Sequence, residues 1–222
     1  MELTAFARWL NTAFADFDYA ILEIYHTLAV HAAPLLTPLM EFLSFIGDDG
    51  LLCFCLAAVL VCFPATRRAG CCILISIALG AIFTNLTLKE LIARPRPFNA
   101  DPLLREFWIY VGAPQQGEMS FPSGHVTSAM ACMTGMCLSV KKKWYILLPS
   151  ALYVALMGAA RNYLMVHYPS DVIGGVIVGG VAGVLGWLIL RAIWQALDRN
   201  RENTVCRFLL EADIRSLKKN KA

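Results

Sequence analysis

The chain has 222 residues, of which 58% are hydrophobic and 16% charged, with a formal net charge of +3 at pH 7. A soluble domain carries about 25% charged residues. The deficit falls in long apolar runs, which argues against a soluble protein and indicates one polytopic membrane domain. No basic stripe alternates with exposed aromatic residues, so we expect no nucleic-acid partner.

The first 48 residues are apolar but interrupted by polar residues and prolines. The interruptions are Asp16, Asp18, Glu23, His26, His31, Pro34, Pro38 and Glu41. Because a carboxylate in mid-span costs about 2.5–3.5 kcal/mol on insertion scales, we expect amphipathic helices in the membrane interface near 2–14, 18–31 and 35–46. A weak first span within 19–46 is the alternative. The N-terminus lacks the pattern of a cleaved signal peptide.

Five later runs are apolar enough to be predicted as membrane spans. They are residues 51–64, 71–88, 123–140, 144–160 and 172–194. A basic turn at 65–70 separates the first two spans, and a polar segment at 89–121 follows the second. Prolines in that segment, at Arg94-Pro95-Arg96-Pro97, cannot continue a helix. The expected fold is therefore all-α, a bundle of five spans, or six if the alternative holds.

Three regions follow from these boundaries: the interfacial helices or weak span at 1–48, a transmembrane core at 49–197 and a basic tail at 198–222. In the tail, Leu210, Ile214 and Leu217 recur at helical spacing, which predicts an amphipathic helix on the membrane surface.

The last predicted span carries three glycines at four-residue spacing, and seven of the eight cysteines lie in apolar runs. Gly175, Gly179 and Gly183 permit close helix contact in lipid, and we expect them to pack inside the bundle rather than in a dimer. The cysteines lack zinc-ligand spacing and predict packing residues instead of a metal site.

The basic residues define the orientation. One side of the membrane receives Arg67, Arg68, the lysines at 141–143 and the basic tail. Because cytoplasmic loops carry the excess of Lys and Arg, this side is predicted to be cytoplasmic, with the chain in the cell membrane and its C-terminus inside. The opposite, outward side receives Lys89, Arg94, Arg96, Arg105 and Arg161, against the rule.

Polar residues at the ends of four predicted spans gather on this outward side. They are Lys89 and Arg96, then Ser123, Gly124 and His125, then Arg161, and finally His167 and Asp171. Fixed cations can neutralise a transferring phosphoryl group, and amides at a helix N-terminus can bind its oxygens. Of two histidines, one can attack phosphorus and the other can donate a proton. Asp171, four residues after His167, can orient its ring.

Each of these residues also has a simpler interpretation. Ser123 and Asp171 could cap helices, Lys89 could extend along a helix end toward the headgroups, and Arg161 could pair with Glu106 or Glu118. Arg94 is predicted to be a solvated loop residue. These interpretations do not explain why histidines and cations gather on the side that the charge rule disfavours, and clusters of this kind indicate function.

The motifs Lys89-x6-Arg96-Pro97, Pro122-Ser123-Gly124-His125 and Arg161-x5-His167-x3-Asp171 resemble the three-part signature of type 2 phosphatidic acid phosphatases. Glucose-6-phosphatases and vanadium haloperoxidases share this signature. The resemblance implies that His167 forms a phosphohistidine, Asp171 orients it and His125 is the general acid. It also implies phosphate binding without a metal or another cofactor, by Lys89, Arg96, Ser123, Gly124 and Arg161. One departure is Ala160, which stands where the family usually has serine.

These observations predict a membrane phosphatase acting on a lipid phosphate or diphosphate at the outer face. Candidate substrates are undecaprenyl diphosphate, phosphatidylglycerophosphate and phosphatidic acid, with a bacterial carrier lipid favoured. A lipid phosphotransferase that uses the same phosphohistidine is the alternative, and a non-catalytic lipid-binding or transport protein is the second. The expected partners are the substrate and membrane lipids, and the sequence leaves the oligomeric state open.

Overall fold

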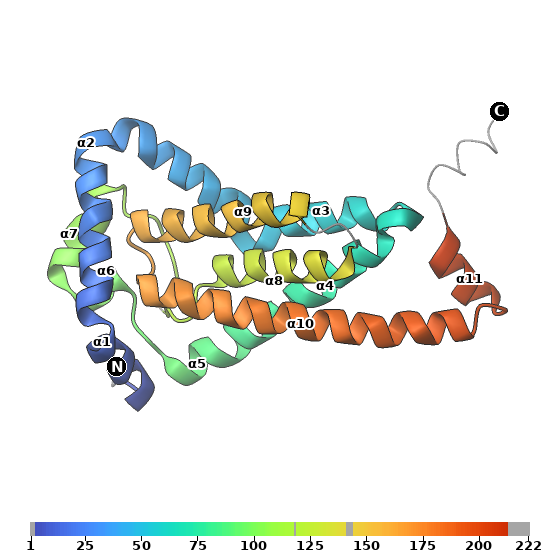
Figure 1. Cartoon of the computed structure of the whole chain (residues 1–222). Coiled ribbons are helices and arrows are strands. Elements are labelled where there is room, and N and C mark those ends of the chain that lie inside the picture. Colours follow the sequence, from blue (N-terminus) through green and yellow to red (C-terminus); the bar gives the residue numbers. More distant parts are fainter. Residues whose placement is uncertain (1–2, 118, 141–143, 213–222) are drawn as a thin grey trace.

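The computed structural model describes residues 3–117, 119–140 and 144–212, which form helices and contain no β-strand. The elements are α1 (Ala5–Ala13), α2 (Ala15–Gly47), η1 (Asp48–Gly50), α3 (Leu51–Val61), α4 (Pro64–Phe83), the π-helical turn η2 (Thr84–Leu88), α5 (Lys89–Ile92), α6 (Pro97–Ala100), α7 (Pro102–Tyr110), α8 (Gly124–Ser139), α9 (Trp144–Tyr163), α10 (Pro169–Arg199) and α11 (Thr204–Glu211). Figure 1 shows a bundle with α6 and α7 at one end, called here the α7 end, and α11 at the other, the α11 end.

Four described stretches are long and apolar enough to cross a membrane. They are Ala15–Val61, Pro64–Ile92, Trp144–Tyr163 and Pro169–Arg199. Large apolar side chains such as Leu35, Leu148 and Ile177 are exposed on them, as lipid-facing residues are. The predicted all-α membrane bundle is therefore confirmed, whereas the count of five spans is approximate, because α8 has 16 residues.

The centre of the bundle is made by α4, α8 and α10, which pack against one another. The glycines of α10 make this approach close. A Cβ atom added at Gly179 would lie 2.5 Å from the backbone oxygen of Thr127, and one at Gly183 would lie 2.4 Å from the Cβ atom of Thr134. The prediction that these glycines pack inside the bundle is confirmed.

Helix α2 is divided by a kink at Ala32, whose φ of −142° is not helical. Pro34 lacks an amide hydrogen and its ring crowds the preceding turn, which accounts for the kink. In Figure 1 the first half of α2 crosses the α7 end of the bundle, and the second half runs obliquely along it towards α3. The two halves correspond to the helices expected near 18–31 and 35–46. Their place in the membrane interface, and the division into three regions, stay predictions.

One loop prediction, the basic turn at 65–70, was wrong. The turn expected at 65–70 is already helical, because Pro64 sits in the first turn of α4, where its missing N–H costs nothing. The polar segment at 89–121 contains α6 and α7, and the side chain of Asp101 caps α7 by accepting from the amides of Leu103 and Leu104. The lysines at 141–143 and the tail beyond residue 212, with Ile214 and Leu217, lie outside the described residues.

Candidate active site

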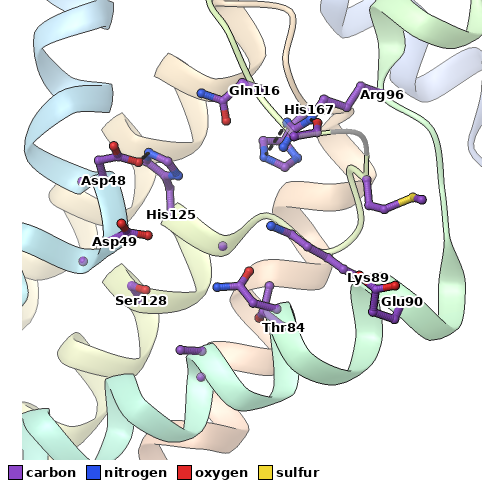
Figure 2. A pocket seen from close by; sticks show the side chains of 18 residues that line it. Asp48, Asp49, Thr84, Lys89, Glu90, Arg96, Gln116, His125, Ser128 and His167 are labelled. Atoms are coloured by element: carbon purple, nitrogen blue, oxygen red, sulfur yellow. Dashed lines mark hydrogen bonds and ion pairs between the residues drawn. The ribbon is translucent and has the colours of Figure 1, made fainter.

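A cavity of about 550 Å³ lies towards the α7 end and collects residues from distant parts of the chain (Figure 2). Five of the eight predicted site residues line it: Lys89, Arg96, Gly124, His125 and His167. The other three, Ser123, Arg161 and Asp171, are almost fully buried beside them. The volume lies within the range of about 300–1,000 Å³ that is usual for small-molecule sites.

His167 lies in the connection between α9 and α10 and is 1% exposed. Its Nδ1 is 3.4 Å from Asp171 Oδ2, and its Nε2 is 3.3 Å from Arg96 Nη1. Burial, followed by the charges of Arg96, Arg161 and Lys89, holds the pKa of His167 well below its ordinary value. The ring is therefore neutral at neutral pH. With the proton on Nδ1, towards the carboxylate, the lone pair of Nε2 faces Arg96 Nη1, and it would be available as a nucleophile when Arg96 binds a phosphate oxygen instead.

His125 lies in the first turn of α8, across the cavity from His167 (Figure 2). Its Nε2 is 3.4 Å from Arg161 Nη1 and 3.6 Å from Asp48 Oδ1. Asp48 comes from η1 and was not among the residues predicted for the site. The guanidinium of Arg161 beside this ring opposes its protonation, so the ring would carry a proton only when a bound anion such as a phosphate group offsets that charge.

Two of the predicted cations are held in place by hydrogen bonds. Arg161, in the last turn of α9, donates from Nη1 to Ser44 Oγ and from Nη2 to Gln116 Oε1 at 2.7 Å. Its partners are therefore neutral groups and not Glu106, one of the two carboxylates of the simpler interpretation, while residue 118 lies outside the described residues. Arg96 donates to the carbonyl oxygens of Val166, at 2.6 Å, and Gly117. Burial lowers the pKa of Arg96 to about 10, so this guanidinium stays charged at neutral pH.

Lys89 follows directly after the π-helical turn η2. A turn of this kind changes the direction of the side chains that follow it and often marks functional sites. The ammonium of Lys89 extends into the cavity (Figure 2), and a Cβ atom added at Gly124 would lie 3.9 Å from its Nζ. Glycine therefore keeps the backbone of α8 open to a group held by Lys89.

Ser123 occupies the N-cap position of α8, but its hydroxyl makes no capping bond. The Oγ atom is buried and has no hydrogen-bond partner among the described residues. The backbone amide of Ser123 donates to the carbonyl oxygen of Asp171 at 3.1 Å, which ties α8 to α10. The interpretation of Ser123 as a plain cap is thus wrong, and a buried unpaired hydroxyl at this position is free to bind an anion.

Arg94 is the main correction to the sequence analysis, which predicted a solvated loop residue. It is 1% exposed and forms ion pairs with Asp18, at 2.8 Å, and Asp171, at 2.6 Å. These partners are 76 and 77 residues away in the sequence, so no local pattern could reveal them. Ala93, in the left-handed conformation with φ of 50°, ends α5 and redirects the chain just before Arg94.

A sequence model of the PAP2 superfamily matches residues 69–198, more than half of the chain. The chain belongs to the PAP2 superfamily. Among its relatives is an undecaprenyl-diphosphatase of Sulfolobus acidocaldarius, 30% identical over 161 residues that cover 71% of this chain and 72% of the relative. Another is a lipid A 4'-phosphatase of Bacteroides thetaiotaomicron, 28% identical over 59% of this chain and 60% of the relative.

Two crystal structures share the fold of this PAP2 protein. LpxE of Aquifex aeolicus is 25% identical, with a TM-score of 0.55 over 74% of this chain and 93% of the other. A PAP2-type phosphatidylglycerolphosphate phosphatase of Bacillus subtilis is 22% identical, with a TM-score of 0.64 over 85% and 92%. Several of these relatives are named as phosphatases, and the Bacillus subtilis protein is named as a transmembrane one, which agrees with the predicted class of enzyme.

Proposed function

We propose that this PAP2 protein hydrolyses the phosphomonoester or diphosphate headgroup of a membrane lipid through a phosphohistidine on His167. The observation that carries the proposal is the arrangement of two histidines across one cavity that is bordered by three cations. His167 Nε2 and His125 Nε2 lie beside Arg96 and Arg161 respectively, and Lys89 extends between them. A phosphoryl group held by the cations would have a nucleophile on one side and a proton donor on the other.

In the first step, Nε2 of His167 attacks phosphorus, and the bond between phosphorus and the leaving oxygen breaks. The electron pair of that bond goes to the leaving oxygen, which takes a proton from His125 and departs as a hydroxyl or phosphate group. The positive charge that develops on the ring of His167 is stabilised by the carboxylate of Asp171, 3.4 Å from Nδ1.

In the second step, His125, now neutral, takes a proton from a water molecule as its oxygen attacks phosphorus. The phosphorus–nitrogen bond breaks, its electron pair returns to Nε2 of His167, and inorganic phosphate is released. Lys89, Arg96 and Arg161 stabilise the oxygens of the transferring group in both steps, together with the hydroxyl of Ser123 and the amide of Gly124. This set of donors requires no metal ion.

The candidate substrates remain undecaprenyl diphosphate, phosphatidylglycerophosphate and phosphatidic acid. Relatives named as undecaprenyl-diphosphatases support the first, and the fold shared with the Bacillus subtilis protein is compatible with the second. The exposed apolar surface of the bundle supports a lipid tail lying beside it while the headgroup enters the cavity. We propose that the α7 end faces the outside of the cell and that the C-terminus is cytoplasmic.

A phosphate-release assay tests the reaction. Purified protein is given lipid monophosphates and diphosphates labelled in the terminal phosphate, with and without a chelator, and is quenched in alkali, where phosphohistidine survives. We expect labelled protein, free phosphate and full activity in the chelator. Label on a second lipid would indicate the phosphotransferase instead, no turnover of any lipid phosphate would favour the lipid-binding alternative, and a loss that magnesium reverses would contradict the metal-free mechanism.

The orientation is tested with a single cysteine at Ala100, an exposed residue of α6, in a background without the native cysteines. We expect a membrane-impermeant maleimide to label it in intact cells. Labelling that requires permeabilised cells would invert the proposed topology.

A further inference from the structure

We infer that Asp18 and Arg94 are positioning residues for catalysis, which act on His167 through Asp171. The inference rests on the proposed function, because it assigns a role in the same phosphohistidine chemistry. It extends the site to the N-terminal helix α2, which lies outside the region matched by the PAP2 superfamily.

Hydrogen bonds run from α2 to Asp171, and the carboxylate of Asp171 lies 3.4 Å from Nδ1 of His167, which makes no hydrogen bond within the described residues. Asp18 Oδ2 accepts from Arg94 Nη2 at 2.8 Å, and Arg94 Nη1 donates to Asp171 Oδ1 at 2.6 Å. The other carboxylate oxygen of Asp171, Oδ2, faces Nδ1 of His167 and accepts from the amide of Tyr168 at 2.9 Å. The rotation of the Asp171 carboxylate is therefore fixed by Arg94 on one oxygen and by Tyr168 on the other.

Further bonds fix Arg94 and Asp18 themselves. Arg94 donates from Nε to Asn11 Oδ1 and from Nη1 to Ser170 Oγ, both at 2.8 Å, and its guanidinium lies 3.9 Å over the ring of Tyr168. Asp18 accepts from the amide of Ser170 at 2.8 Å and from its hydroxyl at 2.6 Å. Helices α1, α2 and α10 thus hold one guanidinium in a single orientation.

Burial strengthens the electrostatic interactions of the cluster formed by Asp18, Arg94 and Asp171. Asp18, Arg94 and Asp171 are 3%, 1% and 0% exposed, so water screens them weakly. With both carboxylates ionised, as their bonds to Arg94 favour, the cluster has a formal charge of −1 beside a neutral His167. When the ring of His167 becomes positive on attack, the sum is zero. Arg94 alone would neutralise Asp171, and Asp18 restores the negative charge that stabilises the ring.

Other charged and titratable groups also face His167, and they stay the same when the cluster is altered. They are Arg96 from the connection after α5, Lys89 from α5, Arg161 from α9 and His125 from α8. A change in the pH dependence on substitution of Asp18 or Arg94 therefore reports the cluster and not the phosphate-binding cations.

The test measures kcat/KM against pH in Asp18→Asn and Arg94→Gln and compares the pH of the acidic limb. Below that pH His167 is protonated and cannot attack. Asp18→Asn removes a negative charge, so its limb moves to lower pH. Arg94→Gln removes a positive charge, so its limb moves to higher pH, by about one unit in each case. In the double variant the charge returns to −1, and the limb returns towards its original position. Both single variants lower kcat about 10-fold or more, with little change in KM.

Matched controls are Asp16→Asn and Arg105→Gln, which alter exposed residues of α2 and α7. We expect both to leave kcat and the limb unchanged. If Arg94→Gln does not fold, Arg94→Lys keeps the charge but loses the planar fork, and it should lower kcat without moving the limb. If the cluster only fastens α2 to α10, the substitutions would lower the melting temperature. They would leave kcat per folded molecule and the pH of the acidic limb unchanged.

Limbs that move in the same direction, or not at all, would overturn the inference. The proposed function fails on a different result, namely alkali-stable label and turnover that persist in His167→Gln. If that variant is inactive while Asp18→Asn and Arg94→Gln behave like the original protein, the phosphohistidine mechanism stands and the positioning role is wrong.

Discussion

Both ends of the bundle bury arginine side chains, and Arg67 at the α11 end is used differently from Arg161 at the α7 end. At the α11 end, Arg67 donates from Nε to the carbonyl oxygen of Val61 at 3.0 Å and from its other nitrogens to carbonyl oxygens of Leu209, Leu210 and Ala212. These carbonyls lie at the ends of α3 and α11. A helix leaves its last carbonyls without partners inside the helix, and Arg67 satisfies them.

At the α7 end, Arg161 is buried more fully than Arg67, but its hydrogen-bond donors are not all satisfied. Its Nη atoms reach Ser44 and Gln116 and approach His125, while Nε has no hydrogen-bond partner among the described residues. The hydroxyl of Ser123 nearby is unpaired in the same sense. Burial of a charge therefore does not by itself indicate a site. The distinguishing features are unpaired donors that lie around a cavity.

The sharpest difference between the ends should come from the proposed nucleophile. His167→Gln is expected to lower turnover by at least about 10⁴-fold, because it removes the imidazole nitrogen that is proposed to accept the phosphoryl group. The control is His31→Gln, which alters an exposed histidine on α2 whose Nδ1 is hydrogen-bonded to the carbonyl oxygen of Thr27. Phosphate release by each purified variant is the measurement. Substantial turnover by His167→Gln would contradict the assignment of the nucleophile to His167 at the α7 end.

The two buried arginines provide the direct comparison. Arg161→Lys is expected to lower kcat about 10²–10³-fold, as loss of a preorganised donor to the transition state does. Arg67→Lys should instead lower the free energy of unfolding by about 1.5–3 kcal/mol through lost hydrogen bonds and leave kcat per folded molecule unchanged. Thermal melts in detergent, together with kinetics, separate the outcomes. A catalytic defect in Arg67→Lys would mean that the ends are coupled.

The unpaired hydroxyl makes a smaller contribution. Ser123→Ala should lower kcat/KM about 10- to 100-fold, the value of a hydrogen bond to a charged group, without lowering stability, because Oγ bonds nothing in the described structure. Ser139, at the other end of α8, donates from Oγ to the carbonyl oxygen of Gly135 at 2.7 Å and makes a matched control. Ser139→Ala should leave kinetics unchanged. Equal kinetic effects would show that Ser123 has no particular role.

The packing of α10 against α8 predicts that added side-chain volume lowers stability at Gly179 and not at the neighbouring Gly180. A Cβ atom in Gly179→Ala would meet the backbone oxygen of Thr127 at 2.5 Å, so the variant should lose about 1–3 kcal/mol of stability. In Gly180→Ala the nearest heavy atom would be the Cε of Met130 at 3.9 Å, an ordinary contact. Melting temperatures measure the difference. Equal values would contradict the close approach of α8 and α10.

The class of fold and the members of the site could be predicted from local pattern. Apolar runs of membrane-spanning length predict helices because the lipid core leaves no other partner for backbone groups. The signature residues stand at short, fixed spacings, such as Asp171 four residues after His167, and each set lies at the end of a helix. Their roles stay predictions, although the structure brings all eight around one cavity.

Only the tertiary structure decided which charges meet. From the sequence, Asp18 is predicted to interrupt a membrane span and Arg94 to be a solvated loop residue. In the structure the two form an ion pair at 2.8 Å and are almost fully buried. Asp48 beside His125, and Ser44 and Gln116 around Arg161, are likewise products of packing. The physical reason is that a buried ion pair depends on distance and dielectric, and both are set by how helices distant in sequence come together.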